Sequence, residues 1–127
     1  MYWTILQVAL GGAIGSVGRY LTGVVTVRAI GTNFPAGTMA VNIIGSFAMG
    51  VVFVYLMTRE QEYLRYVPFV MTGVLGGFTT FSAFSLDLWT LFERGRFVAG
   101  AIYVGGSLGL SVFAVIAGIG FARGLLG

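Results

Sequence analysis

The sequence predicts an all-α integral membrane protein with four transmembrane helices. Charged residues make up only 9% of the 127 residues and hydrophobic residues 57%, whereas ordinary soluble domains contain about 25% charged residues. Four segments are apolar over the roughly 20 residues that a helix needs to cross a bilayer. With so little polar surface, the chain is not expected to fold as a soluble domain.

The four predicted spans form a single membrane domain that covers residues 1–127. They run roughly over residues 3–27, 37–57, 67–92 and 97–121, and the short connections leave no room for a further domain. The first span lacks the basic leader and cleavage site of a signal peptide, so it is expected to remain in the mature protein. Pro35 stands just before the second span, where its fixed dihedral angle suits a helix start.

Composition also excludes several functions. The chain contains no Cys and no His, and all seven basic residues are Arg, so thiolate, imidazole and Schiff-base chemistry are absent. The chain is therefore expected to contribute little to conventional catalysis. Its charges lie between the apolar segments and form no basic stripe, which argues against a nucleic-acid partner.

Glycine is abundant, with 21 residues, and several glycines are spaced four apart inside the spans. Such pairs allow helix backbones to approach closely in lipid, where there is no hydrophobic drive for helix association. Close helix packing is therefore predicted at three pairs: Gly11 and Gly15, Gly73 and Gly77, and Gly105 and Gly109.

The third span is predicted to be broken near mid-membrane. Gly76 and Gly77, which are poor helix formers, precede the β-branched pair Thr79 and Thr80. A break frees backbone carbonyls and amides, which is tolerated at membrane depth only where they line a cavity or bind an ion. On these four residues alone, an unbroken helix is the alternative.

Polar side chains inside the spans are the candidates for function, because lipid penalises them unless they face protein or water. Thr38 and Asn42 share one face of the second span, and Tyr103, Ser107 and Ser111 form a hydroxyl stripe on the fourth. These residues line a pore or, alternatively, form interhelical hydrogen bonds that only hold the bundle together.

Two aromatic residues and one arginine complete the candidates. Phe81 and Phe84 project to similar sides of a helix, and the positive edges of their rings suit a small anion, although simple packing is the alternative. Arg19 lies inside the first span and must face protein, an aqueous vestibule or the membrane interface. Its charge could also draw anions towards a vestibule.

Four motifs considered together indicate a family. They are GGAIGSVGRY at residues 11–20, GTMAVN at residues 37–42, GVLGGFTTFSAFS at residues 73–85 and ERGRF at residues 93–97. The whole chain resembles the Fluc/CrcB family of small bacterial fluoride channels, and the resemblance extends over all four spans.

This resemblance implies a passive, fluoride-selective channel, and not an enzyme, which exports cytoplasmic fluoride across the bacterial inner membrane. It also implies an antiparallel homodimer with two pores, embedded in membrane lipid. By similarity, backbone carbonyls of Gly76 and Thr79 are expected to hold a structural sodium ion at the dimer centre.

The resemblance further implies roles for individual side chains. Phe81 and Phe84 are expected to form an aromatic box, and Asn42 is expected to contact fluoride. The remaining fluoride pathway is expected to include Thr38, Ser82, Tyr103, Ser107 and Ser111, with Arg19 in a vestibule or structural role. Ala83 and Asp87 stand where Thr and Glu are frequent, so the resemblance assigns those two side chains no role.

Two other functions are compatible with a chain of this size. A small proton-coupled multidrug-type transporter needs a protonatable group at depth, whereas Asp87, the only acid inside a predicted span, is expected to be interfacial. A structural subunit of a larger membrane complex would conduct nothing by itself. Flux measurements in liposomes distinguish the three.

The arginines also predict that the protein inserts in both orientations. Arg59, Arg65 and Arg123 lie on one side of four spans, and the other side carries an equal number, namely Arg28, Arg94 and Arg96. Because the excess of basic residues in short loops fixes orientation, this balance favours neither. An antiparallel pair is the expected consequence.

Overall fold

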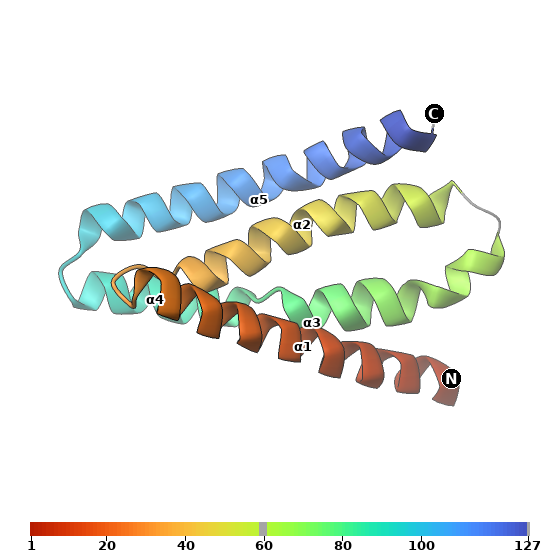
Figure 1. Cartoon of the computed structure of the whole chain (residues 1–127), viewed down its shortest axis with the longest axis horizontal. Helices are drawn as coiled ribbons and strands as arrows, with labels where there is room; N and C mark the ends of the chain where they lie inside the picture. Colours follow the sequence, from red (N-terminus) through yellow and green to blue (C-terminus); the bar gives the residue numbers. More distant parts are fainter. Residues whose placement is uncertain (59–60, 127) are drawn as a thin grey trace.

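The computed structural model describes residues 1–58 and 61–126, and over these residues it is entirely helical and contains no strand. Its helical elements are α1 (Tyr2–Ile30), α2 (Ala36–Met57), the 3₁₀-helix η1 (Gln61–Tyr66), the π-helix η2 (Pro68–Leu75), α3 (Gly76–Phe78), α4 (Phe81–Glu93) and α5 (Phe97–Leu126) (Figure 1). Four helical stretches are long and apolar enough to cross a membrane: Tyr2–Ile30, Ala36–Met57, Leu64–Glu93 and Phe97–Leu126. The predicted all-α class with four spans is confirmed. Arg59, which entered the count of charges, lies outside the described residues.

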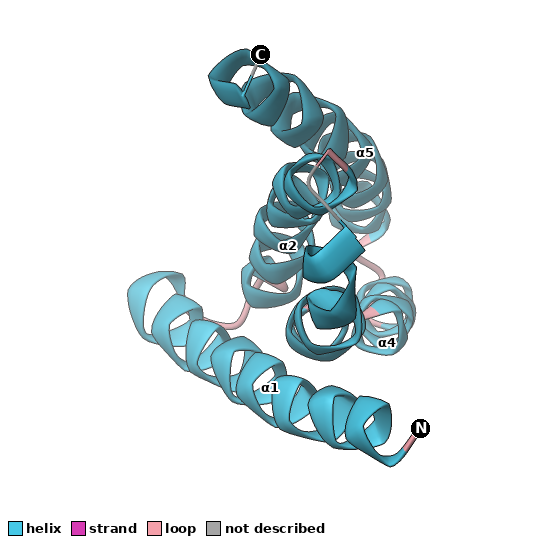
Figure 2. Cartoon of the chain, turned by 90° about the vertical axis from the view of Figure 1, so that its right-hand side faces the viewer, coloured by secondary structure: helices cyan, strands magenta, loops and turns pink. Residues whose placement is uncertain are grey.

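The helices α1 and α5 lie at the two outer edges of the bundle, with α2 and the third span between them (Figures 1 and 2). Gly31 ends α1 with a φ of 81°, and its N–H donates to the carbonyl of Val27 at 2.8 Å. This left-handed conformation is available to glycine at little cost, which explains why the helix stops there. Pro35 is the N-cap residue of α2, as its fixed dihedral angle led us to expect.

The third span changes backbone conformation along its length. It begins as the π-helix η2, becomes α-helical over Gly76–Phe78, and then passes through two extended residues before α4. Thr79 has a ψ of 157°, and Thr80 has a φ of −153° and a ψ of 125°. The Thr80 hydroxyl accepts a hydrogen bond from the N–H of Ala83 at 3.2 Å, so Thr80 acts as the N-cap that starts α4.

Glycines bring α1 against the third span. A Cβ atom on Gly73 would lie 2.9 Å from the Cα of Gly11, and one on Gly77 would lie 2.7 Å from the carbonyl oxygen of Gly12. Real Cβ atoms do not approach so closely, so these backbones meet only because the residues are glycine. By contrast, Gly105 and Gly109 have no described neighbour within 4 Å of such a Cβ atom. The close packing predicted at this last pair does not occur within the chain.

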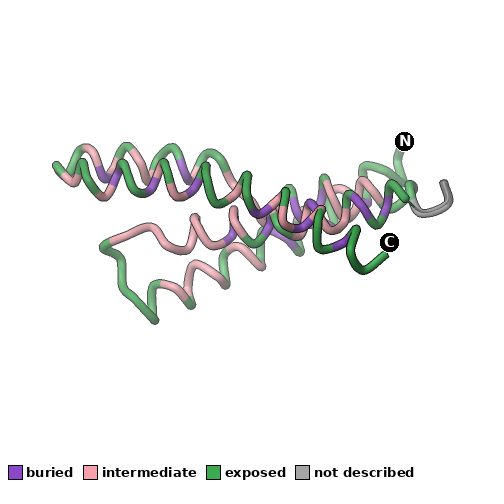
Figure 3. The backbone as a smooth tube through the Cα atoms, turned by 90° about the horizontal axis from the view of Figure 1, so that it is seen from above, coloured by how far each residue is buried: buried purple, intermediate pink, exposed green. Residues whose placement is uncertain are grey.

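Few side chains are buried, and most apolar ones face outward. Buried positions form narrow seams between helices, while much of each helix surface is exposed (Figure 3). Ile14 on α1 and Val112 on α5 are 56% and 61% exposed. Soluble proteins rarely leave such large apolar surfaces uncovered, whereas a helix exterior in lipid requires them. The burial pattern therefore agrees with a chain that spans a membrane.

Candidate functional site

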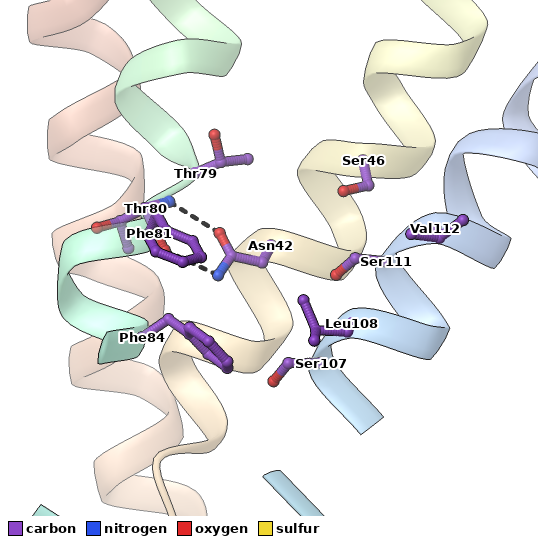
Figure 4. Close-up of a pocket in the computed structure, with 10 residues that line it drawn as sticks. All are labelled: Asn42, Ser46, Thr79, Thr80, Phe81, Phe84, Ser107, Leu108, Ser111 and Val112. Atoms are coloured by element: carbon purple, nitrogen blue, oxygen red, sulfur yellow. Dashed lines mark hydrogen bonds between the residues drawn. The ribbon is translucent and has the colours of Figure 1, made fainter. Parts of the chain in front are cut away.

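A cavity of about 250 Å³ lies between α2, α5 and the start of α4 (Figure 4). It brings together seven residues that the sequence singled out and three others. Its lining residues are Asn42, Ser46, Thr79, Thr80, Phe81, Phe84, Ser107, Leu108, Ser111 and Val112.

Asn42 binds the extended segment through both ends of its side-chain amide. Its Nδ2 donates to the carbonyl oxygen of Thr80 at 2.9 Å, and its Oδ1 accepts from the N–H of Thr80 at 2.8 Å. Both bonds are drawn in Figure 4. The amide thus replaces the partners that the Thr80 backbone lacks outside a helix. One N–H of Nδ2 remains for a guest in the cavity.

The two phenylalanines that the sequence predicts for the site lie at one side of this cavity. Phe81 and Phe84 have ring centroids 5.6 Å apart at an angle of 43°, and the Phe84 ring also lies 5.1 Å from that of Tyr103. Because Thr80 caps α4, the two phenylalanines stand at the first and fourth positions of the helix and project to similar sides. Phe84 is buried, whereas Phe81 is 73% exposed, so this chain alone covers only one of the two rings.

The serines of the predicted hydroxyl stripe lie on the α5 side. The Oγ atoms of Ser107 and Ser111 are both buried, and neither has a hydrogen-bond partner among the described residues. Buried hydroxyls without partners are uncommon because each costs about 1–3 kcal/mol. The cavity therefore offers hydrogen-bond donors for a small polar guest.

Thr38 and Tyr103 do not line this cavity. Instead, both side chains bind the carboxylate of Asp87. The Thr38 hydroxyl donates to Oδ2 of Asp87 at 2.7 Å, and the Tyr103 hydroxyl donates to the same oxygen at 3.1 Å. Tyr103 is fully buried, and the ring of Phe34 packs edge-on against it at 5.6 Å.

This arrangement gives Asp87 two hydrogen-bond partners that helical spacing did not predict. Its carboxylate is held within the helix packing by hydroxyls from two other helices, and it borders a second cavity of about 250 Å³ that Thr38 also lines. The sequence predictions gave Asp87 no role in the site. The signal was present, since Asp87 follows Phe84 by three positions and so shares its face of α4.

Arg19 makes a hydrogen bond to the protein backbone. Its Nε donates to the carbonyl oxygen of Gly77 at 3.1 Å. In an unbroken helix this carbonyl would accept from the N–H of Phe81, which instead belongs to the first turn of α4. The arginine therefore satisfies an acceptor that the extended segment has released, and it also borders a groove of about 500 Å³ along α1.

The remaining predicted residues lie beside this segment. The Thr79 hydroxyl donates to the carbonyl oxygen of Leu75 at 2.9 Å, and the hydroxyls of Thr80 and Ser82 are 3.3 Å apart. Ser82 is exposed and does not line the cavity. Within the described part of the chain, no side chain donates to the carbonyls of Gly76 or Thr79, and no group of three His, Cys, Asp or Glu residues is placed to hold a metal ion.

The chain is thus a bundle of four apolar helices in which α2, α4 and α5 line a cavity with two phenylalanine rings and two unpaired serine hydroxyls, an arrangement that suits a small membrane transport protein. The family model for CrcB-like protein, Camphor Resistance (CrcB), matches residues 6–119, and the chain belongs to this family.

Curated relatives extend over nearly the whole chain. A protein of Cereibacter sphaeroides is 56% identical over 124 residues, which is 98% of both chains. One of Ruegeria sp. (strain TM1040) is 55% identical over 127 residues, or 99% of both. One of Rhizobium etli is 53% identical over 122 residues, which is 95% of this chain and 97% of the relative. Each relative is named a fluoride-specific ion channel, FluC.

Proposed function

We propose that this protein is a fluoride-selective channel that lets cytoplasmic fluoride leave a bacterial cell passively across its inner membrane. The observation that carries the proposal is the cavity in which the unpaired hydroxyls of Ser107 and Ser111 lie with two phenylalanine rings. Near-full-length relatives named as fluoride-specific channels support the choice of ion.

The chemistry of the cavity suits this ion. Fluoride is small, strongly hydrated and a strong hydrogen-bond acceptor, so its path must replace water with donors in a narrow space. Ser107, Ser111 and the free N–H of Asn42 supply donors, and the positive ring edges of Phe81 and Phe84 stabilise negative charge. None of these groups carries a full positive charge, so the ion is solvated without being trapped.

One observation favours a second candidate, a small proton-coupled transporter. Asp87 places a carboxylate inside the helix packing, and such carriers need a protonatable group at depth. The two functions differ in whether anion movement requires a proton gradient.

Purified protein reconstituted into liposomes loaded with fluoride or chloride separates these functions. We expect an ion-selective electrode to record fluoride release without an imposed proton gradient, while chloride is retained. Fluoride release that depends on a proton gradient would instead support the transporter. Equal release of chloride, or no release of either ion, would overturn the channel proposal.

We propose further that two chains assemble as an antiparallel homodimer, with Thr79 and Thr80 near mid-membrane. Thr79 lies close to the middle of the 30-residue helical stretch Leu64–Glu93, which supports that depth. Phe81 lines the cavity although its ring is 73% exposed, and Ser82 is exposed beside it. A second copy related by a two-fold axis in the membrane plane would cover both residues.

Orientation can be tested by adding two Lys residues to one side of the protein in one variant and to the other side in a second. Each variant expressed alone should lose fluoride resistance, and co-expression should restore it. A variant that is fully active alone with a single orientation would contradict the antiparallel dimer.

A structural sodium ion at the dimer centre is the last part of the proposal. Sodium is a hard cation that prefers oxygen ligands, and the carbonyls of Gly76 and Thr79 receive no hydrogen bond from a described side chain. These two carbonyls would hold the ion. A high-resolution density map of protein purified in sodium should contain an ion beside them, and an empty position there would contradict the site.

A further inference from the structure

Ser46 on α2 lines the cavity but has no role in the pathway described above. It lies one helical turn beyond Asn42 on the same face of α2. Figure 4 shows it towards the end of the cavity that is farther from Phe84 and Ser107. The side chain is half-buried.

Some hydroxyls of these helices bond to their own backbone. A Ser or Thr in a helix often donates to the carbonyl four residues earlier, which removes its hydrogen-bonding demand. Six hydroxyls of this chain do so at 2.7–3.0 Å, namely those of Thr22, Thr26, Thr58, Thr79, Ser85 and Thr90.

The three serine hydroxyls of the cavity behave differently. Ser46, Ser107 and Ser111 make no hydrogen bond to any described residue. Other helix hydroxyls without partners, those of Thr4, Ser16 and Thr72, are on residues exposed at the outside of the chain. Ser46 differs from this exposed group because it is half-buried and lines the cavity.

The opposite wall offers no donor at the level of Ser46. The Thr79 hydroxyl is committed to the carbonyl of Leu75, and the Thr79 methyl group occupies the space that a side chain at Gly45 would fill. The remaining lining residues on α5, Leu108 and Val112, are apolar. An anion beyond Asn42 would therefore depend on the side chains of Ser46 and Ser111 for hydrogen bonds.

We propose that Ser46 is a permeation residue whose hydroxyl donates to a small, strongly hydrated halide at the end of the cavity beyond Asn42. This inference rests on the proposed anion path and adds a donor from α2 that faces Ser111 on α5. The two serines would replace part of the hydration shell where the third span presents only a methyl group. Without the α2 donor, the ion would cross this stretch with one hydrogen bond fewer.

The test compares fluoride efflux from liposomes that contain equal amounts of wild-type protein or of the variants Ser46→Ala, Ser46→Thr and Ser46→Val. Ser46→Ala only removes an atom, so it introduces no clash. Threonine and valine have nearly the same shape and differ in the hydroxyl. Thr22→Val is the matched control, because it removes a hydroxyl that is bonded to the carbonyl of Gly18 on α1 and does not line the cavity.

We expect Ser46→Ala and Ser46→Val to release fluoride about tenfold more slowly than wild type, which corresponds to about 1.4 kcal/mol of barrier. Ser46→Thr and Thr22→Val should stay within about twofold of wild type, and size-exclusion profiles should be unchanged. Wild-type or faster flux in Ser46→Ala would overturn the proposal, as would equal rates for the threonine and valine variants. Absence of fluoride flux in the wild-type protein would instead refute the proposed function itself.

Discussion

Replacing Asn42 with leucine should destabilise the protein because the backbone of Thr80 would lose both hydrogen bonds that it makes to this side chain. Leucine is close to asparagine in size, so the exchange removes hydrogen bonds without opening a large cavity. Both the N–H and the carbonyl of Thr80 depend on this amide, at 2.8 Å and 2.9 Å. The change therefore leaves two backbone groups unpaired inside the bundle.

The size of the effect follows from those two groups. An unpaired buried donor or acceptor costs about 1–3 kcal/mol, so the pair should cost about 2–6 kcal/mol. Water that enters the neighbouring cavity can bind the freed N–H and carbonyl of Thr80, which would bring the loss of stability towards the lower end of this range. By the scaling for small domains, even the lower value lowers the melting temperature by roughly 5 °C or more.

Thermal melting of purified protein in detergent measures the loss of overall stability. Hydrogen–deuterium exchange of the peptide that contains Thr80 measures the loss of local stability. Faster exchange at Thr80 is expected together with the lower melting temperature. Ile44→Leu, a volume-conserving change at an exposed position of the same helix, should melt like wild type. If Asn42→Leu melts like this control and Thr80 exchanges at the wild-type rate, the amide does not support the segment.

Three further predictions concern packing, permeation and the buried carboxylate. Gly15→Ala should lower the free energy of unfolding by about 1–3 kcal/mol through overpacking, because the added Cβ would lie 2.8 Å from the backbone nitrogen of Phe78. The control Gly23→Ala should melt like wild type, because its Cβ would meet nothing within 4 Å. Phe81→Ile keeps apolar bulk but removes the ring, so the variant should assemble normally in size-exclusion chromatography and release fluoride more slowly from liposomes. Tyr103→Phe removes one of two donors to Asp87 and should lower the free energy of unfolding by about 1.5–3 kcal/mol, measured as a lower melting temperature. An unchanged melting temperature would show that this hydrogen bond does not stabilise the protein.

Much of the candidate site could be predicted because its members follow local helical spacing. Asn42, Ser107 and Ser111 were selected by position within a span, and the structure gathers them with Phe81 and Phe84 around one cavity. Spacing of three or four residues fixes which side chains share a helix face. It does not fix what each face meets, so it predicts neither the two bonds to Asp87 nor the place of Ser46 in the cavity.

The four spans themselves were determined by the sequence alone. A bilayer core cannot hydrogen-bond a backbone, so each apolar run of sufficient length must satisfy its own N–H and carbonyl groups as a helix. That requirement is local and acts on every residue of a run, whatever its neighbours in space. Composition therefore decided the fold class before any contact between helices was known.

The pairing of polar groups was decided only by the tertiary structure. Asn42 meets Thr80 across 38 positions, Thr38 meets Asp87 across 49, and Arg19 meets Gly77 across 58. Each bond depends on how the helices pack, and that packing depends on where glycines let backbones approach, as they do at Gly77 but not at Gly105. A hydroxyl in a helix can likewise bond to its own backbone or face a cavity, and the choice depends on which neighbouring helix lies beside it.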